Sequence, residues 1–192
     1  MNFLAHLYLS PNDPEIIFGN FIADAVRGRD FDRYPENVKK GILLHRFIDQ
    51  TTDTHPLFLR ACGRLKPFTG RFAGVAADII FDHFLAADWP HFSSVVLSDF
   101  AQQRYQLVEA MQEWLPPKAA RTFHYMKTNN WLVNYADRLF MERVFKGMSG
   151  RVHQGQLLLN SWEALNGNYF LLKKDFEAFF PELISLVKAY RL

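Results

Sequence analysis

Apolar residues recur at helical spacing along most of the chain. Between residues 35 and 52, for example, the apolar residues Val38, Ile42, Leu43, Phe47 and Ile48 recur at helical spacing. Alternation of apolar and polar residues, which is typical of strands, is nearly absent, and hairpin-turn sequences are missing. The pattern therefore predicts an all-α protein.

Proline, glycine and aspartate mark the predicted helix ends. Asp13 before Pro14 is typical of a helix start, and Asp53 is expected to cap the helix that starts at Pro56. Lys66-Pro67 is expected to break the chain. After an apolar segment at 3–9, the predicted helices cover 13–28, 35–52, 57–65, 71–88, 94–114, a stretch from 118, 131–147, 152–166 and 182–190. Residues 167–181 have no clear assignment.

Length and composition favour one compact domain over residues 1–192, since no repeat or low-complexity linker is visible. The 19 Phe, seven Tyr and four Trp predict a core rich in aromatic rings. The single cysteine, Cys62, excludes an internal disulfide and a cysteine-based metal site, and its apolar neighbours suggest a buried thiol.

No signal segment opens the chain, and no apolar run approaches the roughly 20 residues that span a bilayer. We therefore expect a soluble, cytoplasmic protein with no membrane partner. Glycine-rich phosphate loops, dinucleotide fingerprints, GxSxG elbows and HExxH motifs are also missing. Nucleotide-binding folds and serine hydrolases are thus disfavoured, and we expect no nucleic-acid partner.

The net charge is only +2, but basic residues cluster locally. Residues 60–77 and 114–136 contain several lysines and arginines and no acidic residue. Such an excess indicates an anionic partner or substrate, although solvated helix faces give the same pattern.

The candidate chemistry lies in the first half, where Asp and His occur inside apolar helices. Ionisable groups are costly there unless they are paired or bind a metal. The segments are FLAHL with His6, GNFIADAV with Asp24, LLHRFIDQTTDTH with His45 and Asp49, and AADIIFDHFLAADW with Asp78, Asp82 and His83.

Spacing relates these residues in pairs. His45 and Asp49 are four residues apart, as are Asp78 and Asp82, so each pair shares a helix face at about 6 Å. Histidines with carboxylates suit manganese, iron or magnesium better than tetrahedral zinc. Asp82 next to His83 inside an apolar helix is the hardest to explain structurally, which favours metal binding.

Structural roles remain open for the other candidates. His6 fits a hydrogen-bonded core histidine, Asp24 could pair with Arg27, and His45 could bond only to Asp49. Asp78 could orient a ligating histidine instead of binding the metal itself.

Four ordered segments resemble the acyl carrier protein phosphodiesterase family, also called holo-acyl carrier protein hydrolases. The segments are MNFLAHLYLS, GNFIADAVRG, GILLHRFIDQTTDTHP and RFAGVAADIIFDHFLAADW, and the resemblance covers nearly the whole chain. It implies an all-helical fold like that of HD-domain metal-dependent phosphohydrolases. Here Asp82 precedes His83, the reverse of the usual His-Asp order, so ligands cannot be copied position by position.

The resemblance also implies an activity. The expected reaction is hydrolysis of the phosphodiester between 4′-phosphopantetheine and a serine of holo-acyl carrier protein, with Mn²⁺ as the activating ion. We expect the metal ligands to come from Asp24, His45, Asp49, Asp82 and His83. His6, Arg46 and Asp78 are the expected catalytic residues: His6 would protonate the leaving oxygen or complete the metal shell, and Arg46 would contact phosphate. The acidic carrier would dock on Arg27, Arg64, Lys66 and Arg71.

Two other functions share part of this pattern. An HD-type phosphohydrolase that acts on a nucleotide or another small phosphate ester would use the same metal site. A non-catalytic helical module that binds carrier protein would keep the polar residues only as part of its core.

Overall fold

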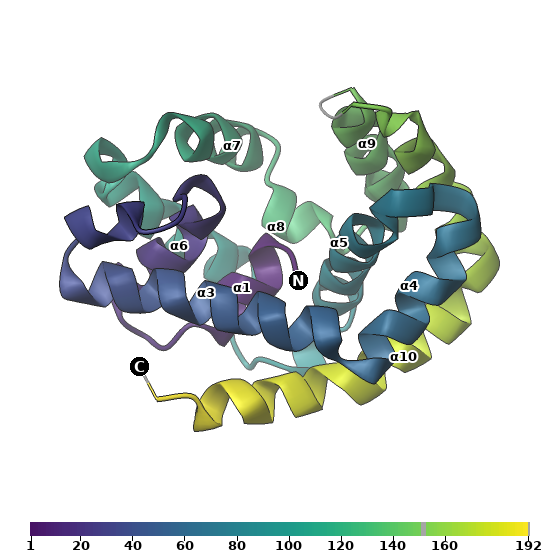
Figure 1. Ribbon diagram of the computed structural model, residues 1–192, viewed down its shortest axis with the longest axis horizontal. Helices are drawn as coiled ribbons and strands as arrows, with labels where there is room; N and C mark the ends of the chain where they lie inside the picture. The colour runs from purple at the N-terminus through teal and green to yellow at the C-terminus, as the bar shows by residue number, and fades with distance from the viewer. Residues whose placement is uncertain (151–152, 192) are drawn as a thin grey trace.

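The computed structural model describes residues 1–150 and 153–191, and over these residues all regular structure is helical (Figure 1). The α-helices are α1 Phe3–Leu9, α2 Pro14–Ile22, α3 Glu36–Thr54, α4 Pro56–Thr69, α5 Ala73–Ala87, α6 Leu97–Ala110, α7 Pro117–Thr128, α8 Trp131–Asn134, α9 Arg138–Ser149 and α10 Ser161–Ala189. Short 3₁₀ helices occur at η1 Ala23–Ala25, η2 Asp30–Arg33, η3 Gly70–Phe72, η4 Trp89–His91, η5 Gln112–Trp114 and η6 Gly155–Asn160. The prediction of an all-α protein is confirmed.

Helices α2 and α3 form the closest pair in the fold. A Cβ atom on Gly19 of α2 would lie 2.1 Å from the carbonyl oxygen of Val38, and one on Gly41 of α3 would lie 2.1 Å from that of Ile16. Only glycine allows the two backbones to approach this closely. The crossing places the end of α2 against the middle of α3, where His45 lies.

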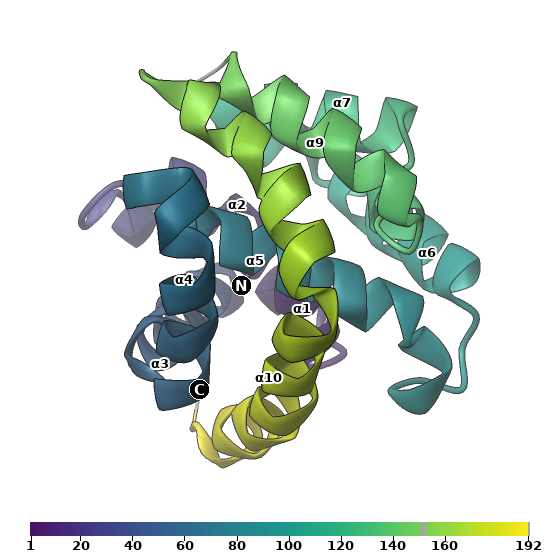
Figure 2. The same cartoon turned by 90° about the vertical axis from the view of Figure 1, so that its right-hand side faces the viewer.

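Helix α1 lies against both α2 and α5, so its short apolar sequence is buried on several sides. On the far side of α5, helices α4 and α10 run side by side (Figures 1 and 2). None of the helices described is both long enough and apolar enough to cross a membrane.

Aromatic rings fill the space between α5 and α10, as the composition predicts. The ring centroid of Phe81 lies 5.5 Å from those of Phe176 and Phe179, and Phe84 lies 5.8 Å from Phe176. All four side chains are fully buried. These ring pairs attach α10 to the rest of the fold.

Several predicted boundaries in the second half are wrong. The helix expected at 131–147 is divided into α8 and α9 by residues 135–137, where Tyr135 is buried and Asp137 caps α9. Residues 161–189, expected as separate pieces, form the single helix α10. It continues past Pro181 because buried residues on both sides, Phe179 and Phe180 before it and Leu183 after it, hold the helix against the rest of the fold. The helix predicted to start at 152 starts outside the described residues.

Predicted boundaries in the first half also need correction. Helix α2 ends at Ile22 and is followed by the 3₁₀ turn η1, so the predicted helix to Gly28 is too long. Helix α4 continues through Pro67 to Thr69. The carbonyl that Pro67 leaves without a donor belongs to the exposed Gly63, which water can reach.

Two local expectations near the start of α4 are wrong as well. Asp53 does not cap α4, because it still lies within α3; the cap is His55, whose Nδ1 accepts from the backbone N–H of Leu57 at 3.3 Å. Cys62 is half-buried instead of buried. By contrast, Asp13 caps α2 as predicted, accepting from the N–H groups of Glu15 and Ile16.

Candidate metal site

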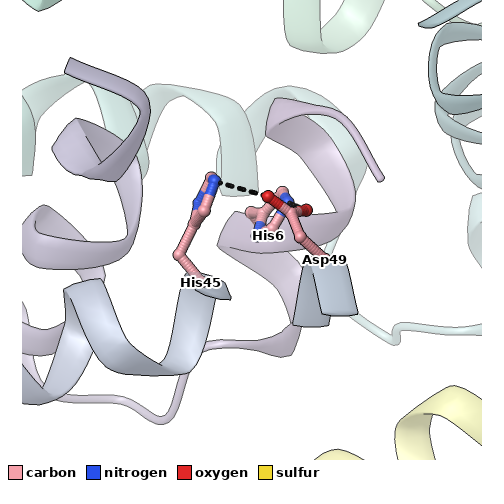
Figure 3. A group of neighbouring side chains, drawn as sticks. All are labelled: His6, His45 and Asp49. Atoms are coloured by element: carbon pink, nitrogen blue, oxygen red, sulfur yellow. Dashed lines mark hydrogen bonds and ion pairs between the residues drawn. The ribbon is translucent and has the colours of Figure 1, made fainter. Parts of the chain in front are cut away.

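His6 of α1 meets His45 and Asp49 of α3 in a compact cluster (Figure 3). Nε2 of His6 lies 3.0 Å from one carboxylate oxygen of Asp49, and Nε2 of His45 lies 3.1 Å from the other. The two imidazole rings are stacked, with centroids 3.9 Å apart. One ligand atom from each residue lies within 4.8 Å of the other two, so the three residues can reach one cation. We call them the HHD cluster.

Asn20 of α2 orients His45. The backbone and side-chain oxygens of Asn20 lie 2.9 and 3.0 Å from Nδ1 of His45, so Nδ1 carries the proton and donates it. Nε2 then faces the carboxylates of Asp24 and Asp49. A backbone or carboxylate acceptor on the second ring nitrogen is the usual support of a metal-binding histidine.

Asn20 also fixes His6. Its amide nitrogen donates to the backbone oxygen of His6 at 3.1 Å and to Oγ of Ser10 at 2.9 Å. One buried side chain therefore holds both histidines in place. Asn20 was not among the residues predicted for the site, although its position inside an apolar helix, four residues before Asp24, was a signal.

The protonation of the histidines differs because their surroundings differ. Burial and, to a lesser extent, the neighbouring His45 lower the pKa of His6 to about 4. Burial also disfavours the charged form of His45, but the carboxylates of Asp24 and Asp49 outweigh it and raise its pKa to about 9. Burial by itself would raise the pKa of Asp49, but the hydrogen bonds and charges of the two histidines outweigh it and keep this pKa below its usual value. The cluster thus concentrates negative charge next to two imidazoles.

Asp24 of η1 approaches the cluster from its open side. Its carboxylate lies 3.4 Å from Nε2 of His45, and its side chain is 67% exposed. Arg27, which was considered as an alternative partner of Asp24, forms no ion pair with it. His45 lowers the pKa of Asp24, so the carboxylate is ionised at neutral pH.

Asp82 and His83 are not part of the HHD cluster. Asp82 is fully buried and accepts hydrogen bonds from the backbone N–H groups of Leu4 and Ala5, at 2.7 and 3.2 Å. Nδ1 of His83 lies 2.7 Å from the carbonyl oxygen of Tyr135, and Nε2 lies 3.0 Å from the Tyr169 hydroxyl. The side-chain atoms of Asp82 and His83 that were expected to bind a metal therefore bond to other groups of the protein.

Asp78 reaches the cluster indirectly. Its carboxylate lies 2.7 Å from the backbone nitrogen of Met1, and this nitrogen lies 3.7 Å from Asp49. The carbonyl oxygen of Met1 also contacts Nε2 of His6 at 3.1 Å. Asp78 thus supports the residues around the cluster without contacting the histidines, which fits the alternative role considered for it.

The donor set fits a divalent cation. Nδ1 of His6 is buried without a hydrogen-bond partner, which is costly for a polar atom, and Nε2 of His45 is buried with only the carboxylates of Asp49 and Asp24 close to it. A cation on Nε2 of His45 would take the place of a proton there and neutralise both carboxylates. Mixed nitrogen and carboxylate ligands suit manganese or iron.

The basic candidates are scattered. Arg46 donates to the carbonyl oxygen of Gly28 at 2.8 Å and stacks over the Phe31 ring, so its guanidinium is bound by backbone and aromatic neighbours. Arg64 pairs with the buried carboxylate of Asp175 at 3.0 Å. Arg71 donates to the carbonyl oxygen of His153.

Arg27 and Lys66 are exposed. A further basic residue, Lys118 of α7, lies beside the cluster: its ammonium group is 3.2 Å from the backbone oxygen of Asp24.

Comparison with known proteins covers the whole chain. The family model described as acyl carrier protein phosphodiesterase matches residues 1–183. The acyl carrier protein phosphodiesterases of Enterobacter sp. (strain 638) and Klebsiella pneumoniae (strain 342) are 34% and 33% identical to the present chain, over the full length of both sequences. That of Shigella boydii serotype 18 is 34% identical over 96% of each chain. No solved structure matches.

Proposed function

The chain belongs to the acyl carrier protein phosphodiesterase family, and from this premise we propose that it hydrolyses the phosphodiester bond between 4′-phosphopantetheine and a serine of holo-acyl carrier protein. The products are apo-carrier protein and 4′-phosphopantetheine. The observation that carries the proposal is the HHD cluster, which stands beside a cavity and is flanked by the ionised Asp24. We place this activity in the cytoplasm, with no nucleic-acid or membrane partner, and relate the fold to HD-domain phosphohydrolases.

His6, His45 and Asp49 would hold the divalent ion, with Asp24 as a further ligand from the open side. Mn²⁺ is the expected ion, and Mg²⁺ and Fe²⁺ are alternatives. When bound, such an ion activates water for attack and neutralises charge on the phosphate oxygens. This assignment replaces the expected ligands Asp82 and His83, which are bound to other parts of the protein.

The protein itself supplies orientation. Asn20 holds both histidines, and Asp82 holds the N-terminus of α1, so the ligand atoms are set before substrate binds. We assign His6 to the ion-holding set and not to protonation of the leaving serine oxygen, since an imidazole with a pKa of about 4 is neutral at pH 7 and has no extra proton to give. Asp78 positions residue Met1 against this set.

The same geometry argues against a nucleoside polyphosphate as substrate. Asp24, Asp49, Asp53 and Asp78 line the cavity beside the cluster, and no lysine or arginine is among the lining residues within 1–150 and 153–191. Several phosphates in a row would be repelled by these carboxylates. A single phosphodiester with a neutral arm would be repelled less, which supports the preferred substrate over a nucleoside polyphosphate.

The test is incubation of the purified protein with holo-acyl carrier protein and Mn²⁺, followed by intact-mass measurement of the carrier. We expect the carrier to lose the phosphopantetheine mass with the wild-type protein, and to keep it after metal is removed with a chelator. An unchanged carrier mass in the presence of Mn²⁺ would show that the proposed activity is wrong.

Variants test the cluster separately. Asp49→Asn should lower kcat/KM at least 100-fold and weaken Mn²⁺ binding in calorimetry, because it removes a ligand charge. The matched control is Asp99→Asn on α6, an exposed aspartate away from the cluster, which should change neither. Full activity and normal Mn²⁺ binding of Asp49→Asn would rule out the HHD cluster as the metal site.

A further inference from the structure

A cavity of about 340 Å³ adjoins the HHD cluster. Asp24 and Asp49 are among its lining residues, so it opens directly onto the proposed ion position. Its walls also include Trp131 of α8 and Met148 of α9, which come from the second half of the chain. The cavity therefore connects the cluster with the helices α8 and α9, whose role the sequence did not indicate.

A second cavity, of about 210 Å³, shares Trp131 and Met148 with the first. Its other walls include Phe140, Val144 and Arg143 of α9. Because both cavities are lined by these two side chains, they lie next to each other, the first against the cluster and the second against Arg143. We call the two neighbouring cavities together the arm groove.

The cavity next to the HHD cluster is lined by both apolar and uncharged polar side chains. Val75 and Ile79 of α5 provide apolar wall, while Asn2, Thr122 and Tyr135 provide amide and hydroxyl groups. The Asn2 amide already donates to the Tyr135 hydroxyl and the Thr122 hydroxyl to a backbone oxygen, which leaves the Asn2 carbonyl oxygen, the Tyr135 O–H and the Thr122 oxygen for a ligand. A ligand that fits must combine apolar carbon with groups that form neutral hydrogen bonds. The carboxylates at the cluster end tolerate only one anionic group there, and only next to a cation.

We propose that the arm groove binds the pantetheine arm of the substrate, with its phosphate at the HHD cluster and its thiol end toward Trp131 and Met148. The arm has one phosphate, two amides and a dimethyl-substituted carbon, which match the carboxylate end, the polar groups and the apolar wall in turn. The carrier protein then stays outside, at the exposed side near Asp24. The inference rests on the proposed function, since it assigns a subsite for that substrate.

Blocking variants test the groove. Val75 is 38% exposed at its wall, so Val75→Trp places an indole in the groove without filling the core. We expect at least a tenfold rise in KM for holo-carrier protein, and a fall of similar size in the ratio of holo-carrier to bis(p-nitrophenyl) phosphate hydrolysis, because the latter diester has no arm. Val96→Trp, at an exposed position preceding α6, is the matched control and should leave both values unchanged.

A binding measurement tests the groove independently of catalysis. Adding 4′-phosphopantetheine with Mn²⁺ should change the tryptophan fluorescence of the wild-type protein, and Trp131→Phe should remove at least half of that change. Thr122→Trp, from α7, provides a second blocking variant if Val75→Trp fails to fold by circular dichroism.

The outcomes separate the two proposals. If the wild-type protein leaves holo-carrier intact, the proposed function fails, and the fluorescence titration alone decides whether the arm groove binds 4′-phosphopantetheine. If the wild-type protein cleaves holo-carrier, but a folded blocking variant keeps the wild-type KM or Trp131→Phe keeps the full fluorescence change, the groove assignment is overturned.

Discussion

The buried carboxylate of Asp82 accepts a hydrogen bond of 2.7 Å from the backbone N–H of Leu4. A second N–H, from Ala5, lies 3.2 Å from its other oxygen, so Asp82 binds two of the free donors at the start of α1. Through this contact α5 fixes the short helix that carries His6. Asp82, which the sequence predicts as a metal ligand, therefore supports the site indirectly, by holding the helix that carries His6.

Asp82→Asn should lower stability more than it lowers metal binding. The amide keeps the shape of the carboxylate but has one acceptor fewer, which leaves a buried N–H of α1 without a partner. We expect a loss of about 1–3 kcal/mol in the free energy of unfolding, measured in urea. Mn²⁺ affinity should fall by no more than about tenfold. Complete loss of Mn²⁺ binding with unchanged stability would instead make Asp82 a ligand.

Gly41→Ala should disrupt the crossing of α2 and α3. The new methyl group would lie 2.1 Å from the backbone oxygen of Ile16, which cannot move without shifting α2. We expect a loss of about 3 kcal/mol or more, or no folding at all, in thermal and urea denaturation. Gly63→Ala is the matched control in an exposed helix position with no atom nearby, and it should stabilise by about 0.5–1 kcal/mol. Equal effects of the two changes would contradict this account.

Cys62 should react slowly with alkylating reagents at neutral pH. Burial raises the pKa of its thiol to about 11, and the charges of Asp78 and Asp53 act in the same direction. Because only the thiolate reacts, the rate with iodoacetamide, followed by mass spectrometry, should rise about tenfold per pH unit from pH 8 to 10. The urea-unfolded protein should instead level off near pH 9, and the same early plateau in the folded protein would argue against the raised pKa.

Arg27 and Arg64 should respond differently to charge reversal, although both were predicted to dock the carrier. Arg27 is exposed and follows Asp24 closely in the chain, so Arg27→Glu should raise KM for holo-carrier protein about five- to tenfold, with weaker dependence on salt. Arg64 and Arg60 together hold the buried carboxylate of Asp175, so Arg64→Glu, which puts a second carboxylate beside it, should lower the free energy of unfolding by about 3–5 kcal/mol. A KM effect for Arg64→Glu without loss of stability would restore it as a docking residue.

The sequence by itself determined the helical class, the aromatic core and the pairing of His45 with Asp49. These features depend on local spacing: residues four apart on one helix meet wherever that helix lies. The four segments that resemble the family also lie in local stretches of sequence, so the family was recognisable from the sequence alone.

Other features depended on the tertiary structure. His6 joins His45 only because the glycine crossing and Asn20 bring α1, α2 and α3 together, and no spacing along the chain reports that contact. Asp82 and His83 looked equally suited to bind metal, because a buried ionisable group needs a partner of some kind. Which partner it finds, a backbone N–H, a tyrosine or a cation, is decided by the helices that pack against it.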